Sequence, residues 1–125
     1  MRGIAAYKQN RVESASPAQI VMMLFQEAVH RLTRALHTLD SDPVSWRKDI
    51  HHTREIYLEL FSALDPQAAP EMCANLGGLY QWCISELVEA GRTKDEKRIR
   101  DVLKVTTTLL EGWQVVARGG AEAAK

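Results

Sequence analysis

The stretch Ser14-Ala15-Ser16-Pro17-Ala18-Gln19, which runs straight into Ile20-Val21-Met22-Met23-Leu24-Phe25, decides the fold that we expect. The Ser16 side chain can accept a hydrogen bond from a free N–H of the first turn, and Pro17 suits the first helical position. Gln19 can bond back to the N-cap backbone, which completes a capping box. The apolar residues that follow have helical spacing, so a long and largely buried helix should begin here.

Apolar periodicity along the rest of the chain predicts four helices and no strand. The first should cover about residues 17–39 and end at Asp40-Ser41-Asp42-Pro43, because proline disfavours helical geometry in the preceding residue. Gly91 is the expected stop of the third helix, and Gly119-Gly120 that of the fourth. The predicted core-facing residues are Ile20, Met23, Leu24, Ala28, Leu32, Ala35 and Leu39, with a second line of Met22, Phe25, Val29 and Leu36; Trp46, Ile50, Thr53, Tyr57, Leu60 and Leu64; Met72, Leu76, Leu79, Cys83, Leu87 and Ala90; and Ile99, Val102, Thr106, Leu109, Trp113 and Val116.

The connections between these helices are short, so consecutive helices should be antiparallel neighbours. The expected fold is all-α, an antiparallel up-and-down four-helix bundle. We place the bundle at residues 16–118, an N-terminal arm that can cap a binding groove at residues 1–15, and a flexible Gly-Ala-rich tail at residues 119–125.

Composition restricts the class of protein. Sixteen lysines and arginines balance sixteen aspartates and glutamates in 125 residues, so no net field draws the chain to nucleic acid or an anionic membrane. No apolar run resembles a signal peptide or reaches the roughly 20 residues that span a bilayer. Cys73 and Cys83 would lie about 15 Å apart on one helix, too far for a disulfide. We expect a soluble cytoplasmic protein with reduced cysteines and no membrane insertion.

Catalytic and metal chemistry find little support. Glu27-x-x-His30 has the spacing of half a di-iron site in a bundle. The sequence has no second Glu-x-x-His, and the inward positions of the third and fourth helices are apolar apart from Thr106. No glycine-rich phosphate loop occurs. We predict no metal, no cofactor and no enzymatic activity, which leaves a metal-dependent bundle enzyme as the least favoured hypothesis.

Two further features have competing interpretations. The run Arg92–Arg100 holds five basic residues, but Asp95 and Glu96 interrupt it, so we interpret it as a solvated helix start and not as a nucleic-acid patch. Gly77-Gly78 lies in mid-helix, where each glycine costs roughly 1 kcal/mol relative to alanine. It indicates either close approach of a neighbouring helix or a flat patch for the backbone of a guest.

The second and third helices carry a wider apolar face than their seams require. Ile56, Tyr80 and Ile84 are expected beside the seams, and Leu58 and Phe61 add to the face. Such width indicates either deeper packing against the first helix or an open groove that receives an amphipathic helix of another protein.

The arm carries large apolar side chains, namely Ile4, Tyr7 and Val12. A terminal segment has little reason to carry a large aromatic residue unless the ring packs somewhere. Tyr7 either pins the arm to the bundle or belongs to a segment that folds over the binding surface when this surface is empty.

In the order and spacing of its parts, the chain resembles the flagellin-specific export chaperones of bacteria, the FliS family. The resemblance covers nearly the whole chain. It is carried by Tyr7-Lys8-Gln9-Asn10 with Val12, Ser14-Ala15-Ser16-Pro17, Met23-Leu24-Phe25, Ile56, Leu60, Leu64-Asp65, Asn75-Leu76, Leu79-Tyr80, Leu87, Ala90, Asp95 and Trp113.

This resemblance implies a protein that binds the C-terminal segment of flagellin, prevents its premature polymerisation and delivers it to the flagellar type III export gate, without nucleotide or cofactor. In the family the N-terminal tyrosine segment covers part of the binding surface, which implies a gating role for Tyr7 and its neighbours. The partner-binding residues expected on this basis are Ile4, Tyr7, Asn10, Val12, Ile56, Leu60, Leu76, Tyr80 and Ile84.

The alternative function is that of a helical adaptor of the same descent, which binds a different secretion or regulatory client. A flagellin gene near this one would favour the export chaperone, and a genome without flagella would favour the adaptor. An exposed groove and a free arm also favour a homodimer in the absence of cargo.

Overall fold

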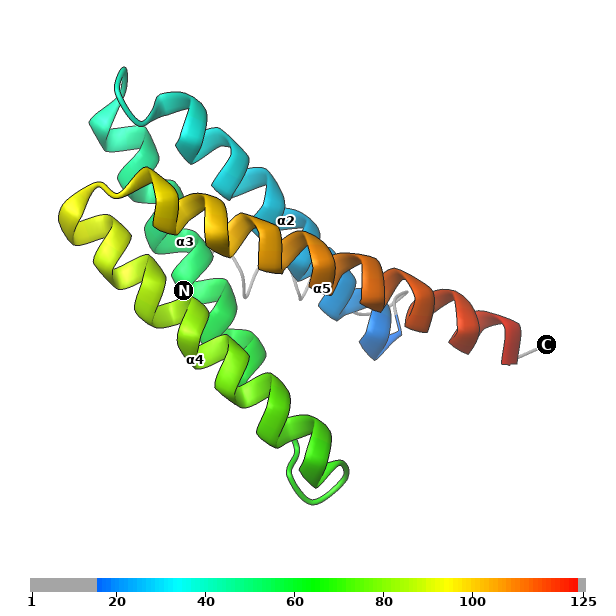
Figure 1. Ribbon diagram of the computed structural model, residues 1–125. Helices are drawn as coiled ribbons and strands as arrows, with labels where there is room; N and C mark the ends of the chain where they lie inside the picture. Colours follow the sequence, from blue (N-terminus) through cyan, green and yellow to red (C-terminus); the bar gives the residue numbers. More distant parts are fainter. Residues whose placement is uncertain (1–15, 124–125) are drawn as a thin grey trace.

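A computed structural model describes the backbone of residues 16–123 and the side chains of residues 16–118. It contains the α-helices α2 (Pro17–Thr38), α3 (Pro43–Ser62), α4 (Pro70–Thr93) and α5 (Glu96–Ala123), with no strand in the described part of the chain. The helices run alternately up and down, and α2 lies beside both α3 and α5 (Figure 1). The predicted all-α four-helix bundle is confirmed.

The start of α2 forms the predicted capping box. The Gln19 N–H donates to the Ser16 hydroxyl over 3.2 Å, and the Ser16 N–H donates to the Gln19 side-chain oxygen over 2.9 Å. At the start of α3, the Ser45 N–H donates to the Asp42 carboxylate over 3.1 Å, and Pro43 occupies the first turn. These local bonds satisfy N–H groups that the helices themselves leave free.

Three aromatic rings from three helices meet in the core. Phe25, Tyr57 and Tyr80 have ring centroids 5.7 to 6.3 Å apart, within the range for favourable aromatic pairs. Leucine, isoleucine, valine and alanine side chains of the four helices complete one continuous core. The seams predicted for α2 and α3 are largely buried, which explains why these helices dock without a disulfide or metal.

The ends of the last two helices differ from expectation. α4 does not stop at Gly91 but continues to Thr93, and Lys94 then adopts the left-handed conformation with φ of 57°. α5 does not stop at Gly119-Gly120 but reaches Ala123. An interior glycine costs a helix only about 1 kcal/mol, so it ends a helix only where another signal agrees.

The first half of α4 is rotated by about one residue relative to the predicted seam. Its buried line is Cys73, Gly77 and Tyr80, whereas Met72 is 49% exposed. The same rotation turns Met72 and Leu76 toward α5. It brings the Tyr80 ring into the aromatic cluster instead of beside the seam.

No helix packs so closely on Gly77-Gly78 that a side chain is excluded. A Cβ atom at Gly77 would lie 3.7 Å from Phe61 and Leu64 side-chain atoms, an ordinary contact, and one at Gly78 would meet nothing within 4 Å. Close helix packing within the chain is therefore not what requires these glycines.

The bundle is closed at one end and open at the other. α4 and α5 are joined by a tight turn at Lys94-Asp95, and an ion pair of 2.9 Å between Arg98 and Glu86 links them near this turn. From there the two helices diverge toward the start of α4 (Figure 1). Toward the open end, Phe61 and Met72 are among the large apolar side chains that stay exposed.

Candidate partner-binding site

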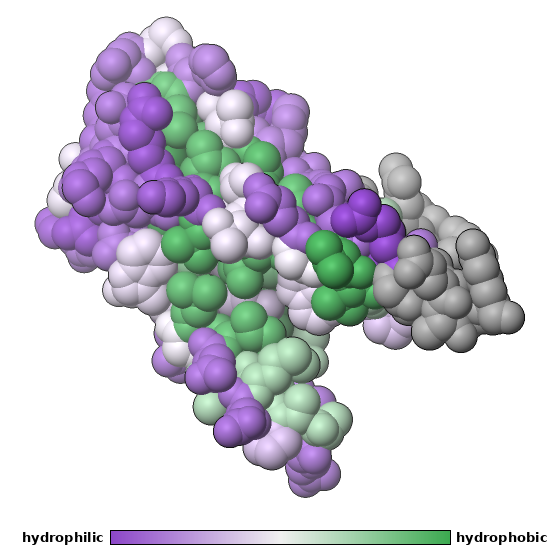
Figure 2. Space-filling model, turned by 45° about the vertical axis from the view of Figure 1, so that its right-hand side comes forward, coloured by the Kyte–Doolittle hydropathy of each residue, from purple (hydrophilic) through white to green (hydrophobic). Residues whose placement is uncertain are grey.

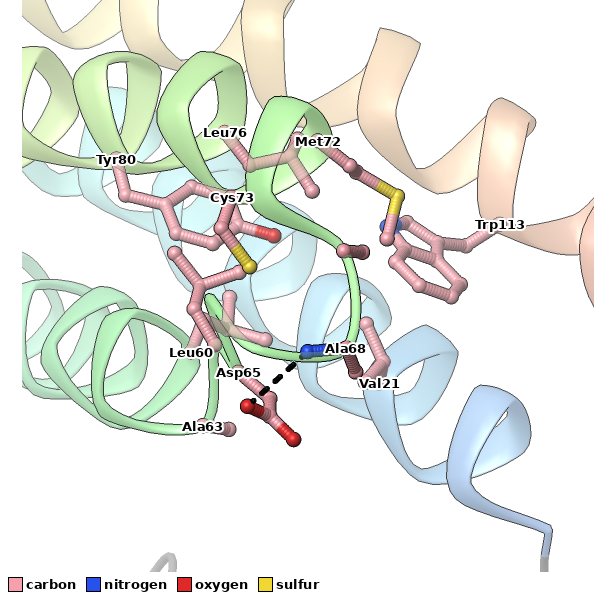
Figure 3. A pocket seen from close by; sticks show the side chains of 12 residues that line it. Val21, Leu60, Ala63, Asp65, Ala68, Met72, Cys73, Leu76, Tyr80 and Trp113 are labelled. Atoms are coloured by element: carbon pink, nitrogen blue, oxygen red, sulfur yellow. Dashed lines mark hydrogen bonds between the residues drawn. The ribbon is translucent and has the colours of Figure 1, made fainter.

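A cavity of about 230 Å³ lies at the open end, between all four helices and the α3–α4 loop (Figure 3). Its walls are almost entirely apolar, and Asp65 is the single charged residue among them. The lining residues are Val21 from α2; Leu60 from α3; Ala63, Leu64, Asp65, Ala68 and Ala69 from the loop; Met72, Cys73, Leu76 and Tyr80 from α4; and Trp113 from α5.

Met72 and Trp113 form the mouth of this cavity. The thioether of Met72 on α4 is directed toward the Trp113 indole on α5, so the two side chains reach across the gap between the diverging helices (Figure 3). Thioether and indole contacts of this kind are favourable but weak. The mouth is therefore built from side chains that can separate at little energetic cost.

A second depression, of about 460 Å³, runs along the outer side of α3 and α4. Phe61 of α3 and the Gly77-Gly78 pair of α4 belong to its walls. Leu64, just after α3, and Cys73, in the first turn of α4, line both depressions, so the two depressions adjoin each other. Figure 2 shows hydrophobic surface in the angle where α4 and α5 diverge, while the closed end is mostly hydrophilic.

Three of the predicted partner-binding residues come together in the cavity: Leu60, Leu76 and Tyr80. Ile84 is half-buried and packs against the core. Ile56 differs from expectation, because it is fully buried in the core instead of lying beside the α3 seam. The buried face of α3 is broad because this helix packs against both α2 and α4, and Ile56 belongs to it.

The arm residues Ile4, Tyr7, Asn10 and Val12 lie outside the described residues. The role of all nine residues in partner binding therefore stays a prediction.

Met72 and Val21 are cavity residues that the sequence did not mark as a site. Met72 was expected in the core, and Val21 fell outside both predicted apolar lines of its helix. Trp113 was expected as a core residue; it is half-buried, packs against the core and also lines the cavity. No sequence signal marked Met72, Val21 or Trp113 as cavity residues, because their positions there depend on how α4 and α5 diverge.

Burial keeps two titratable side chains in and near the cavity uncharged. Burial raises the pKa of Tyr80 to about 12 and that of Cys83 to about 11, so both side chains are uncharged at neutral pH. The described residues contain no group of three histidine, cysteine or acidic side chains that would hold a metal. A largely apolar cavity of this kind suits apolar groups of a ligand.

No helix in the described part of the chain is long and apolar enough to cross a membrane.

Comparisons with known proteins place the chain in one family. The family model of the flagellar protein FliS matches residues 1–120. The chain is 32% identical over 112 residues to the flagellar secretion chaperone FliS of Campylobacter jejuni, with 89% of this chain and 88% of the relative covered. It is 31% identical over 121 residues to the FliS of Salmonella typhimurium, with 92% and 90% covered.

A crystal structure of a flagellar chaperone from bacteria has the same fold, with a TM-score of 0.74 at 20% sequence identity and 98% coverage of both chains. The match of the family model to nearly the whole chain, together with relatives above 30% identity, decides the assignment. The chain belongs to the FliS family of flagellar secretion chaperones, which are not enzymes.

Proposed function

We propose that this protein is a cytoplasmic export chaperone for flagellin. It binds the disordered C-terminal segment of flagellin, prevents premature polymerisation and delivers the cargo to the flagellar type III export apparatus. The observation that carries this proposal is the apolar cavity at the open end of a bundle from the secretion chaperone family. A cavity with one charged residue among its walls suits apolar helix residues, which are also the residues that would drive premature assembly.

Reversible binding follows from the balance of two free energies. Each Å² of apolar surface that the cargo buries contributes about 25 cal/mol. Ordering a disordered segment opposes this by several kcal/mol. The net affinity is then sufficient to hold the cargo and low enough to release it at the export gate.

The cargo contacts that we propose begin with Leu60, Leu76 and Tyr80 in the cavity and extend to Ile84 on α4. Ile56 would act from within the core, by holding α3 in place. Ile4, Tyr7, Asn10 and Val12 would cover part of the surface when cargo is absent. Supporting this role, Val21 lines the cavity and follows Ser16 by only five residues, so the arm joins the bundle near the site.

Titration calorimetry with the C-terminal segment of flagellin from the same organism tests the proposal. We expect one-to-one binding, a gain of helix by circular dichroism, and a single complex on gel filtration. Gel filtration without cargo also reports whether the protein forms a homodimer. A lack of both heat and complex would overturn the flagellin assignment and leave the adaptor function to be tested with other secretion clients.

Met72→Asp and Leu76→Asp are the variants that probe the site. Ile56 and Tyr80 are 0% and 2% exposed, so a charge there would unfold the protein before it reported on binding. Met72 is half-exposed and lines the cavity, which makes Met72→Asp the cleaner probe. Val44→Asp, at a position 67% exposed and remote from the cavity, is the matched control. We expect Met72→Asp to weaken flagellin binding at least about ten-fold while Val44→Asp leaves it unchanged.

A further inference from the structure

Charge is distributed unevenly along this neutral chain. Residues 55–91, from the middle of α3 to the last turns of α4, contain six acidic residues and no lysine, arginine or histidine. The six acidic residues are Glu55, Glu59, Asp65, Glu71, Glu86 and Glu89. Every lysine and arginine of the protein therefore lies outside residues 55–91, which supply most of the cavity wall.

Part of this negative charge is compensated within the protein. Glu86 pairs with Arg98 and Glu89 with Arg92, both toward the closed end of the bundle. At the open end, the structure records no ion pair of Asp65 or Glu71 with any residue that it describes. Asp65 lines the cavity, and Glu71 directly precedes the lining residue Met72; we call Asp65 and Glu71 the acidic rim of the cavity.

Asp65 lines the cavity, and its side chain accepts hydrogen bonds from the backbone of the α3–α4 loop. Its Oδ1 atom accepts from the N–H groups of Gln67 at 3.1 Å and of Ala68 at 3.4 Å, and these bonds shape the α3–α4 loop; Figure 3 shows the bond from Ala68. The residue is exposed, so its carboxylate also faces solvent. A cation of a bound partner could reach it without displacing any bond that the loop needs.

The cavity beside Asp65 has the size of one bulky side chain. Its volume of about 230 Å³ exceeds the roughly 150 Å³ of an apolar cavity that accepts benzene. On a helix, a residue three or four positions away lies on the same face, about 5–6 Å from the first. An apolar side chain in the cavity therefore places a cation of the same helix face within reach of the acidic rim.

We propose that the cavity and its acidic rim form an anchor site for a cargo helix that carries a bulky apolar side chain with a lysine or arginine one helical turn away. This inference rests on the proposed binding of flagellin. The apolar side chain fills the space among Leu60, Leu76 and Trp113, and the cation pairs with Asp65.

The charge half of the proposal is tested with Asp65→Asn. Asparagine keeps the side-chain oxygen that the Gln67 and Ala68 N–H groups need and removes only the charge. We expect the affinity for the C-terminal flagellin segment to fall about two- to five-fold at low salt, with a smaller fall at high salt. Glu111→Gln, an exposed acidic position on α5 outside the cavity, should leave the affinity unchanged.

A double-mutant cycle identifies the cation. Each lysine and arginine of the flagellin segment is replaced by glutamine and measured against both the wild-type protein and Asp65→Asn. The partner of Asp65 is the residue whose replacement weakens binding to the wild type but not to the variant. If no cation couples to Asp65, the charge half of the proposal is wrong.

The apolar half is tested by filling the cavity with Ala68→Leu, because Ala68 is an exposed cavity residue outside the helices. The neighbouring substitution Gln67→Leu adds an apolar side chain that does not line the cavity and is the matched control. We expect Ala68→Leu to weaken flagellin binding at least about ten-fold and Gln67→Leu to have no effect. Circular dichroism and thermal unfolding verify that both variants fold.

The outcomes separate this proposal from the proposed function. Normal flagellin binding by Ala68→Leu and Asp65→Asn would overturn the anchor site and leave the chaperone function standing. Tighter binding by Ala68→Leu would also overturn it, because the cavity would then hold a competing segment such as residues 1–15. No binding by the wild-type protein would overturn both.

Discussion

The Tyr57 hydroxyl lies 2.6 Å from the Oγ1 atom of Thr106 and joins α3 to α5 inside the core. Thr106 donates its own hydrogen to the Val102 carbonyl oxygen at 2.7 Å, which leaves Tyr57 as the donor of the longer-range bond. Both residues are fully buried. This bond fixes the register of two helices that are far apart in the sequence.

Removing the two ends of this bond should have unequal effects on stability. Tyr57→Phe leaves Thr106 bonded to Val102, so we expect a loss of about 0.5–1.5 kcal/mol. Thr106→Val leaves the Tyr57 hydroxyl buried beside a methyl group and should cost about 1–3 kcal/mol. Urea unfolding measures both, and the double variant should be less destabilised than the sum of the two. Equal losses for the single variants would contradict the donor assignment.

Asp49 should matter more to stability than any acidic residue on the surface. Its fully buried carboxylate receives hydrogen bonds from Arg34 at 2.7 and 2.8 Å and from Arg31 at 3.1 Å. We expect Asp49→Ala to cost about 1–3 kcal/mol, because the two guanidinium groups are partly exposed and regain water. Asp40→Ala, which breaks an exposed pair with Lys94, should stay within about 0.5 kcal/mol of wild type in urea unfolding.

Acid should also weaken the fold through Asp49. Burial raises the pKa of this carboxyl group, but the hydrogen bonds and charges of Arg34 and Arg31 outweigh burial and hold the pKa below its ordinary value of 3.8. A lowered pKa stabilises the fold above the unfolded-state value, and this contribution disappears as pH falls through the folded-state value. Thermal unfolding between pH 6 and about pH 2 should therefore show a loss that is smaller in Asp49→Asn.

Alkaline pH should destabilise the bundle through groups that burial keeps protonated. The pKa of Cys83 rises from 9.0 to about 11 and that of Tyr80 from 10.0 to about 12, both chiefly by burial. Because these folded-state values exceed the unfolded ones, their contribution is complete below about pH 9 and is lost as pH rises through about 11–12. A melting temperature that stays constant from pH 8 to about pH 11 would contradict this expectation.

Gly78→Ala should stabilise the protein by about 0.5–1 kcal/mol, since a Cβ atom there meets no neighbour and alanine favours the helix. Gly112→Ala, which is equally free of neighbours, is the matched control for stability. Flagellin titrations of the two variants then distinguish their roles. A selective loss of affinity in Gly78→Ala would show that the missing side chain serves a guest, whereas equal affinities would remove that interpretation.

Local signals were enough to predict most of the fold. The Ser16 capping box and the seams of α2 and α3 depend on residues close together in the sequence, and the structure confirms them. The wrong face of the first half of α4 was predicted to be buried, because the line through Met72, Leu76 and Leu79 is as apolar as the line that the structure buries. The true line passes through Gly77, which has no side chain to mark it as buried.

The cavity was harder to predict, for a tertiary reason. Leu60, Leu76 and Tyr80, which the sequence analysis proposed for partner binding, do line one cavity, but nothing in their spacing shows that α4 and α5 diverge around them. Because the helices diverge, Met72 and Trp113 line an open cavity between them. This divergence arises from the packing of whole helices, which a pattern of single residues does not encode.

The tight turn at Lys94 holds the end of α4 next to the start of α5, whereas the start of α4 lies far from α5. With 24 residues, α4 is about 36 Å long, and its fixed end is at the turn. A tilt of about 5° about that end carries the first turn of α4 through roughly 3 Å, about the width of a methylene chain. The distance between the start of α4 and α5, and with it the width of the cavity, therefore depends on an angle set at the opposite end of the molecule, where the Arg98–Glu86 ion pair links the two helices.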